Sequence, residues 1–304
     1  MLRRTARKSE AWQGEDLVFL VGHPRSGTTF LGRLLGAHPS IGYWEEAALI
    51  HVAAQFHQTL RDLHRHLQVD AGLDVLRLTE RDSTRAQFPL DDEATDEADR
   101  RALAHTREVV KRLVDDFRSR SGRPMVLEKT PAAVGMLQPM AALLPDARAV
   151  HIVRDPRDIV ASMQRITRQK GRPEFIPAEG DVVDVTARQW LELVSNGLDV
   201  GARLGGSVVH VLRHEDLVAD PKVHVGRLLD FLGLPWCREI DEFLAAGMPP
   251  PKPKKNRALS GIDPGRSGVW AERLTPEDAA RVVSLAGGLM ARLGYESDGP
   301  PLRA

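Results

Sequence analysis

The chain has 304 residues, and its 42 lysines and arginines balance its 42 aspartates and glutamates. This length suits one large α/β domain, and the zero formal net charge gives no global reason to expect nucleic acid or a membrane surface as a partner. A single cysteine, Cys237, excludes an internal disulfide and a cysteine-based metal site. Residues 1–16 form a polar tail without the apolar core of a signal peptide, and no segment reaches transmembrane length. We therefore expect a cytoplasmic protein without stable membrane insertion.

The first predicted elements are a strand, a glycine-containing loop and a helix. Leu17–Val21 is an unbroken apolar run, which is typical of a strand buried on both faces. The loop 22–27 follows, and the helix is expected to begin near Thr28, where apolar residues start to recur at helical spacing. Loop N–H groups and a helix N-terminus together attract an anion. The sequence therefore predicts a phosphate-binding site, with the hydroxyls of Thr28 and Thr29 beside it.

This loop differs from the loop of nucleotide triphosphatases. Gly22 and Gly27 fit the spacing G-x-x-x-x-G-K-[ST], but Thr28 stands in place of the lysine, and the cation lies inside the loop as Arg25. The exchange counts against an ATPase or kinase that uses a metal ion and a loop lysine. The motif Pro-Arg-Ser-Gly-Thr-Thr at 24–29 resembles the phosphosulfate-binding loop of sulfotransferases, which use 3′-phosphoadenosine 5′-phosphosulfate (PAPS). The resemblance implies that the loop binds this cofactor through Arg25, Ser26, Gly27, Thr28 and Thr29.

A short second strand is predicted at 41–44, just before two acidic residues, Glu45 and Glu46. Ligands of open parallel sheets lie at the carboxyl ends of the strands, so at least one of these glutamates is a candidate general base. The run from the loop threonines to these glutamates resembles tyrosylprotein sulfotransferases. This resemblance implies that Glu46 is the catalytic base, with Glu45 as the alternative. Residues 47–122 are expected to form a helical cap beside the sheet.

A third strand is predicted at Met125–Leu127, followed by the sequence Glu-Lys-Thr-Pro at 128–131. This segment resembles the N-K-x-P or E-K-x-P element of sulfotransferases. The resemblance implies that Lys129 contacts the transferring or bridging oxygen. From the residues alone, a surface lysine at a strand end is the alternative.

A fourth strand is predicted at Ala149–Val153, followed by the sequence Arg-Asp-Pro-Arg-Asp at 154–158 and a helix. The planar fork of Arg154 and the hydroxyl of Ser162 are suited to phosphate. The pattern R-D-P-R-D-x-x-x-S resembles the 3′-phosphate-binding element of sulfotransferases, and Arg154 and Ser162 fall on its binding positions. From the residues alone, a salt-bridged turn is the alternative.

The rest of the chain predicts three helices, a strand and a loop. The elements are a helix at 186–204, a strand at 207–212, a helix at 218–232, and a last helix that starts with the capping residue Thr275 and the proline after it. Residues 248–268 are rich in Pro, Lys and Gly, and we expect a basic lid loop over the cofactor, or else a solvated basic tract. Arg266, Ser267 and Gly268 resemble an element that contacts the 3′-phosphate. Residues 297–304 form a polar tail.

The predicted elements form a three-layer α/β/α fold with a mostly parallel central sheet, in a single P-loop sulfotransferase-like domain at 17–296. The implied reaction moves a sulfuryl group from PAPS to an acceptor hydroxyl or amine and releases the bisphosphate PAP without a metal. Glu46 takes the acceptor proton, while Arg25 and Lys129 stabilise charge. The acceptor (a sugar, a peptide tyrosine, a lipid or a small natural product) and the oligomeric state stay open. The alternatives are a P-loop kinase or nucleotide hydrolase, and a catalytically inactive nucleotide-binding protein.

Overall fold

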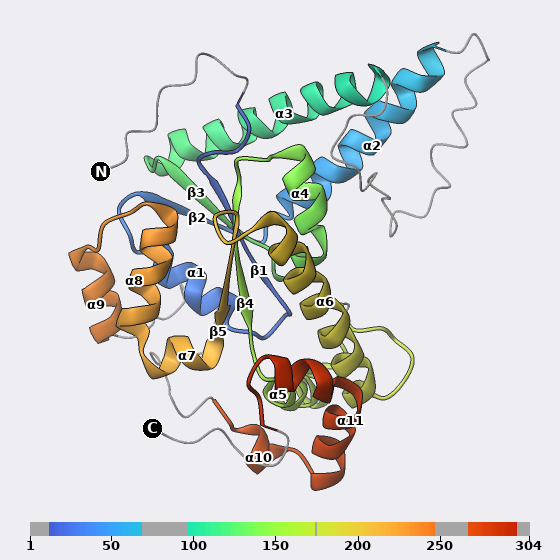
Figure 1. Ribbon diagram of the computed structural model, residues 1–304, viewed down its shortest axis with the longest axis vertical. Coiled ribbons are helices and arrows are strands. Elements are labelled where there is room, and N and C mark those ends of the chain that lie inside the picture. The colour runs from blue at the N-terminus through green and yellow to red at the C-terminus, as the bar shows by residue number, and fades with distance from the viewer. Residues whose placement is uncertain (1–11, 69–96, 174, 247–266, 297–304) are drawn as a thin grey trace.

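A parallel sheet forms the centre of the computed structural model, which describes residues 12–68, 97–173, 175–246 and 267–296 (Figure 1). The strands are β1 (Leu17–Gly22), β2 (Ile41–Glu45), β3 (Met125–Lys129), β4 (Arg148–Val153) and β5 (Val209–Arg213). They lie in the order β2-β3-β1-β4-β5, and each neighbouring pair of these strands is parallel. The three-layer parallel fold is therefore confirmed. Strand β3 is longer than predicted, because Glu128 and Lys129 continue its pairing with β2.

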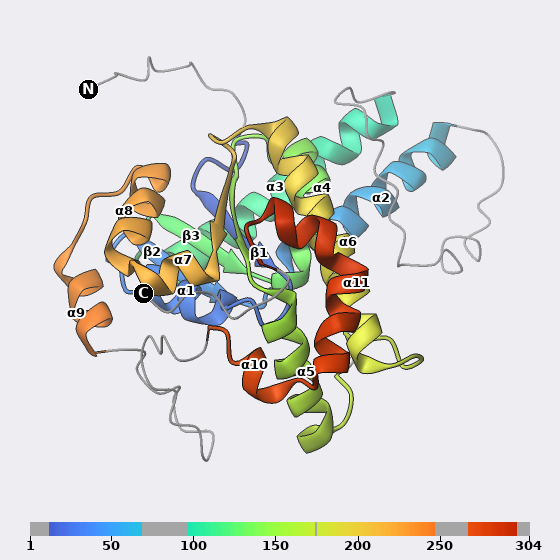
Figure 2. The same ribbon diagram turned by 60° about the horizontal axis from the view of Figure 1, so that its bottom comes forward.

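Side chains of the strands alternate between two apolar cores, as the pleat of a strand requires. On β1, Phe19 and Val21 face one core, whereas Val18 and Leu20 face the other. The first core is covered by α2 (Leu49–Gln68), α3 (Glu97–Ser121), η2 (Pro131–Met136), α4 (Leu137–Leu143) and α6 (Val182–Leu204). The second core is covered by α1 (Thr28–Gly36), α7 (His214–Ala219), α8 (Pro221–Leu232) and α9 (Arg238–Ala246). Figures 1 and 2 show these two sets of helices on opposite sides of the sheet.

A third apolar core lies beyond the carboxyl end of β4. It is formed by α5 (Pro156–Lys170), α6, α10 (Trp270–Arg273) and α11 (Pro276–Arg292), at the bottom of Figure 1. Trp190 of α6 is fully buried within it. The predicted cap of the last helix is present, because Thr275 Oγ1 accepts a hydrogen bond of 3.1 Å from the N–H of Asp278. This core fixes the segment that follows β4.

The helix predicted at 218–232 is instead two helices. α7 ends at Ala219 and α8 begins at Pro221, because proline cannot continue a helix but fits its first turn. Asp220 caps α8 by accepting a hydrogen bond of 3.2 Å from the N–H of Val223.

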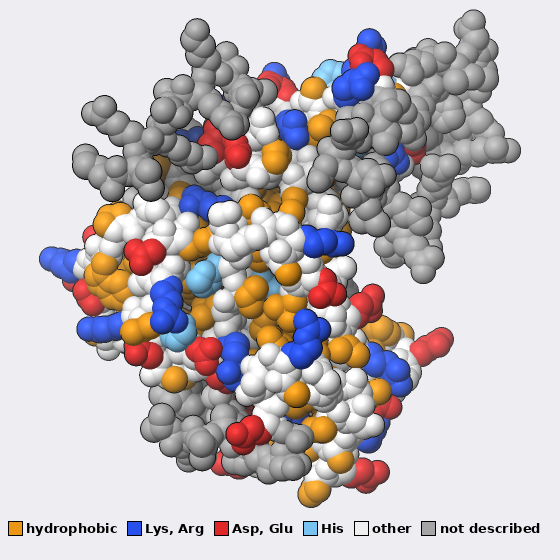
Figure 3. Space-filling view, viewed as in Figure 1, with side chains coloured by type: hydrophobic (Ala, Val, Ile, Leu, Met, Phe, Trp, Pro, Cys, Tyr) orange, Lys and Arg blue, Asp and Glu red, His pale blue; other side chains and the backbone are white. Residues whose placement is uncertain are grey.

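The surface carries a balanced mixture of charges. Figure 3 shows basic and acidic side chains interspersed over the face seen in Figure 1, in keeping with the equal totals in the sequence. Within the part of the chain that the structure describes, no helix is both long enough and apolar enough to cross a membrane.

Candidate active site

The loop after β1 lies at the point where the strand order reverses. Strands β3 and β2 lie on one side of β1 within the sheet, whereas β4 and β5 lie on its other side. Open α/β sheets bind ligands at such a point. At Gly22, a Cβ would lie 2.3 Å from the carbonyl oxygen of Ile152, so only glycine fits. Gly27 has φ +98°, and its Cβ would lie 2.6 Å from His214 Nδ1. These glycines let the loop turn tightly into α1, whose N-terminus attracts anions.

The loop contains a strained arginine and a buried hydroxyl. Arg25 has φ +78°, a left-handed conformation that costs a residue with a Cβ about 1–3 kcal/mol and is concentrated at ligand sites. Its side chain is exposed, and its Nε donates a hydrogen bond of 3.2 Å to Ser162 Oγ. Ser26 Oγ is buried and has no hydrogen-bond partner among the described residues. A buried hydroxyl without a partner fits a phosphate oxygen as its missing acceptor.

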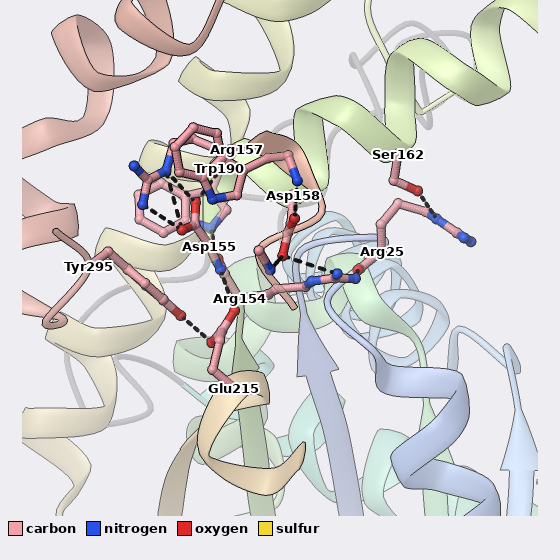
Figure 4. Close-up of polar contacts among 11 residues, drawn as sticks. Arg25, Arg154, Asp155, Arg157, Asp158, Ser162, Trp190, Glu215 and Tyr295 are labelled. Atoms are coloured by element: carbon pink, nitrogen blue, oxygen red, sulfur yellow. Dashed lines mark hydrogen bonds and ion pairs between the residues drawn. The ribbon is translucent and has the colours of Figure 1, made fainter. Parts of the chain in front are cut away.

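Arg154 joins the end of β4 to this loop (Figure 4). Its Nη1 donates a hydrogen bond of 3.2 Å to the carbonyl oxygen of Arg25, and Trp190 Nε1 donates one of 2.9 Å to the carbonyl oxygen of Arg154. The predicted residues Arg25, Arg154 and Ser162 therefore lie together, although they come from the end of β1, the end of β4 and helix α5. Two arginines in one site favour an anion or a carboxylate beside them, because it balances their positive charge.

Asp158 supplies such a carboxylate and was not predicted to do so. Its Oδ2 accepts hydrogen bonds from Arg154 Nη2 at 3.3 Å and from the N–H of Gly268 at 2.9 Å, and its Oδ1 accepts one of 2.9 Å from the N–H of Trp270. Burial raises the pKa of Asp158, whereas the charge of Arg154 opposes the rise. Asp158 thus brings the predicted 267–268 segment to Arg154. The predicted contact residue Arg266, and most of the predicted lid, lie outside the described residues.

The predicted alternative of a salt-bridged turn also holds for part of this segment. Asp155 accepts a hydrogen bond of 2.8 Å from the N–H of Arg157 and caps α5. The buried guanidinium of Arg157 also pairs with Asp155 at 2.8 Å, and it lies 3.9 Å from the ring centre of Trp270. The second arginine of the motif is therefore structural, whereas the first, Arg154, faces the loop.

Glu215 supports the same segment from α7. Its Oε1 accepts a hydrogen bond of 3.0 Å from the N–H of Asp155, and its Oε2 accepts one of 2.9 Å from the hydroxyl of Tyr295 (Figure 4). Burial raises the pKa of Glu215 to about 7, and the N–H of Asp155 and the hydroxyl of Tyr295 only partly oppose this rise. The carboxyl group thus titrates near neutral pH.

Replacement of Glu215 by Gln is expected to remove one contribution to the dependence of stability on pH. Its folded-state pKa lies above the ordinary value of 4.5, so between these values the folded chain binds more protons than the unfolded chain. The contribution of Glu215 to the free energy of unfolding therefore falls as pH rises through this window, by up to about 3 kcal/mol. Glutamine keeps an acceptor for the N–H of Asp155 and cannot ionise.

Urea unfolding at about pH 5 and about pH 8 measures this difference. Relative to its value at pH 5, we expect the free energy of unfolding at pH 8 to be higher in Glu215→Gln than in the wild type. Glu192→Gln, which alters an exposed glutamate of α6, should show the same change as the wild type. An equal change of the free energy of unfolding in all three proteins would contradict the assignment of the titration to Glu215.

The second group of predicted residues lies at the carboxyl ends of β2 and β3. The side chain of Lys129 is fully buried, yet its Nζ lies 2.7 Å from Glu46 Oε1 and 3.3 Å from Glu45 Oε1. Both glutamates are exposed, Glu46 by 66% of its side chain. An ammonium group has three N–H bonds, so these carboxylates leave one for a further acceptor. The predicted base and the predicted cation are therefore neighbours.

The two groups of residues flank β1 at one edge of the sheet. Lys129 belongs to β3 on one side of β1, and Arg154 follows β4 on the other side. Thr28 is buried and Thr29 is half-buried in the first turn of α1. Within the described ranges, His, Cys, Asp and Glu side chains do not gather into a set of three or more that could hold a metal ion. The arrangement offers hydrogen-bond donors for anions and, beside them, a carboxylate that can accept a proton.

The parallel sheet, the loop at the strand switch and the two arginines, Arg25 and Arg154, at this loop are typical of an α/β enzyme that acts on an anionic ligand. A model described as the sulfotransferase family matches residues 17–238, and the chain belongs to this family, whose members transfer a sulfuryl group. The kinase and hydrolase alternatives are not favoured.

Comparison with individual proteins agrees with this assignment. Protein-tyrosine sulfotransferase 1 of Danio rerio is 26% identical over 94% of this chain and 74% of its own length. Carbohydrate sulfotransferase 5 of Mus musculus is 25% identical over 98% and 85%, respectively. Among solved structures, the sulfotransferase domain from the curacin biosynthetic pathway has the same fold, with a TM-score of 0.58 and 18% identity over 94% of this chain and 99% of that chain.

Proposed function

We propose that this chain transfers the sulfuryl group of PAPS to an acceptor hydroxyl and releases PAP. The observation that carries the proposal is the contact between the loop after β1 and the pair Arg154 and Ser162. PAPS has phosphates at both the 5′ and 3′ positions of its ribose, whereas the phosphates of ATP form one chain. The loop after β1 and the pair Arg154 and Ser162 form two sets of hydrogen-bond donors that meet at the strand switch. Two such sets suit PAPS better than ATP.

In this proposal, the 5′-phosphosulfate end is held by the loop after β1. The loop N–H groups, the unpartnered hydroxyl of Ser26 and the hydroxyls of Thr28 and Thr29 act as donors there. Arg154 and Ser162 hold the 3′-phosphate. The segment Ser267–Gly268 lies next to this position, because Asp158 accepts hydrogen bonds from both Arg154 and the N–H of Gly268. Arg25 lies between the two positions, because its Nε contacts Ser162 while its backbone belongs to the loop.

When bound, PAPS supplies the sulfuryl group and a phosphate leaving group. Glu46 accepts the proton of the acceptor hydroxyl, whose oxygen forms the new bond to sulfur. Lys129 donates its remaining N–H to the oxygen on which negative charge develops, and Arg25 and the loop amides stabilise charge on the sulfuryl oxygens. The burial of Lys129 strengthens these interactions, because few water molecules compete for its ammonium group.

The acceptor belongs to a class that carries a hydroxyl group. The names of the relatives include a protein-tyrosine sulfotransferase and a carbohydrate sulfotransferase, and both tyrosine and sugars offer hydroxyl groups. The exposure of Glu46 leaves its carboxylate accessible to an acceptor from solution. A hydroxyl is therefore favoured over an amine, while the choice between a peptide, a sugar and a small molecule stays open.

Calorimetric titration with PAP, with ATP as the comparison and EDTA present, tests the two-phosphate site. We expect tighter binding of PAP than of ATP, because the contacts of Arg154 and Ser162 with a 3′-phosphate are absent for ATP. EDTA is not expected to reduce PAP binding. A preference for ATP, or a requirement of PAP binding for a divalent metal, would overturn the proposal and favour a nucleotide hydrolase.

A further inference from the structure

The turn that carries Glu46 is held in a strained conformation. Glu46 has φ +53° and Ala48 has φ +50°, so two residues with a Cβ adopt the left-handed region within three positions. Such conformations are unfavourable for these residue types and persist only where surrounding contacts enforce them. The turn lies between the end of β2 and the start of α2 at Leu49. Its shape therefore depends on contacts from another part of the chain.

The contacts that enforce this turn come from consecutive residues at the end of β3. The N–H of Glu46 donates a hydrogen bond of 2.7 Å to the carbonyl oxygen of Lys129. The N–H of Ala48 donates one of 3.0 Å to Thr130 Oγ1. The same hydroxyl donates a hydrogen bond of 2.6 Å to Glu128 Oε1. The hydroxyl of Thr130 thus connects the turn to a carboxylate in the sheet.

Glu128 is suited to anchor this connection. It is fully buried and lies in a strand whose other described side chains are mainly apolar. Burial raises the pKa of Glu128, whereas the hydroxyl of Thr130 and the N–H groups of residues 47–49 oppose the rise. A hydroxyl has one hydrogen to donate, so its donation to Glu128 leaves its lone pairs for the N–H of Ala48. The direction of both hydrogen bonds is therefore fixed.

We propose that Thr130, oriented by Glu128, is a positioning residue that holds the 46–48 turn so that the carboxylate of Glu46 meets Lys129 and the acceptor hydroxyl. This inference rests on the proposed role of Glu46 as the base. It adds a cause for the placement of that base. Lys129 contacts the tip of the Glu46 side chain and the N–H of residue 46, whereas Thr130, together with Glu128, holds the other end of the turn. A displacement of about 1 Å in a reacting group can reduce turnover roughly 100-fold.

The test compares Thr130→Val with Thr130→Ser. Valine has nearly the shape of threonine but lacks the hydroxyl, whereas serine keeps it. We expect Thr130→Val to lower kcat roughly 10- to 100-fold, with little change in the Kd of PAP, because Arg154 and Ser162 are remote in sequence and lie beyond β1. Thr130→Ser is expected to recover most of the lost kcat. Retained PAP affinity also shows that the variant is folded.

A double-mutant cycle with Glu46→Gln separates this inference from the proposed function. If Thr130 acts through Glu46, then Thr130→Val should cause little further loss in the Glu46→Gln background. Unchanged kcat in Thr130→Val, a parallel loss of PAP binding, failure of serine to recover activity, or a full additional loss in the double variant would each overturn the inference. Full activity of Glu46→Gln alone would instead overturn the proposed base, and the inference with it.

Discussion

Glu46→Gln is expected to lower kcat roughly 10²- to 10⁴-fold, the usual contribution of a general base. Glutamine has nearly the same shape and keeps an oxygen that can accept the hydrogen bond of 2.7 Å from Lys129 Nζ, but it cannot take up a proton. The Kd of PAP should change little, because Arg154 and Ser162 lie on the other side of β1. Steady-state kinetics with an acceptor that the wild type sulfates, together with calorimetry, measures both quantities.

Glu45→Gln is the matched control for this experiment. Glu45 precedes Glu46 and also faces Lys129 Nζ, at 3.3 Å. We expect a far smaller loss of kcat in this variant, because its carboxylate is the more distant partner of Lys129. A large loss in Glu45→Gln with near-normal turnover in Glu46→Gln would transfer the role of base to Glu45.

Arg154→Ala is expected to weaken PAP binding roughly 10- to 100-fold, since a hydrogen bond to a charged group contributes about 1.5–3 kcal/mol. Binding of 5′-AMP, which has no 3′-phosphate, should change little. The loss is therefore expected to appear as a fall in the ratio of the two affinities, which calorimetry with each ligand measures.

Arg168→Ala provides the control for the removal of a positive charge. Arg168 is an exposed residue in the last turn of α5, the helix that carries Ser162, and its Nη2 donates to Gln164 Oε1. We expect this variant to bind both ligands as the wild type does. If Arg154→Ala weakened PAP and 5′-AMP equally, the arginine would support the loop after β1 through its contact with Arg25 and would not bind the 3′-phosphate.

Much of the fold could be predicted because its elements are specified by local patterns. The buried strands are short apolar runs, and α1 and α11 begin at a glycine turn and at a threonine–proline cap, respectively. Residues of the candidate site could be predicted because Arg25, Lys129 and Arg154 each follow or end a strand. In a parallel sheet, the carboxyl ends of strands meet at one edge, so position in the chain implies position in space.

The supporting residues could not be predicted, because their partners are distant in sequence. Asp158 accepts hydrogen bonds from a segment 110 and 112 positions away, and Thr130 accepts one from a residue 82 positions away. Glu128 offered one local signal, a carboxylate inside an apolar strand, which is unfavourable unless a specific set of donors surrounds it. Asp158 offered another, since it follows Arg154 by four positions and the first turn of α5 brings it into contact with that arginine.

A crystal structure of the protein with PAP bound is the decisive test of the proposed two-phosphate site and of the base beside it. We expect the 5′-phosphate within hydrogen-bond distance of the loop N–H groups and of Thr28 or Thr29, and the 3′-phosphate within hydrogen-bond distance of Arg154 and Ser162. We also expect the carboxylate of Glu46 to face the 5′-phosphate end of the ligand. A 3′-phosphate bound away from Arg154, or a ligand whose 5′ end points away from Lys129 and Glu46, would contradict the proposed arrangement of donor, cation and base.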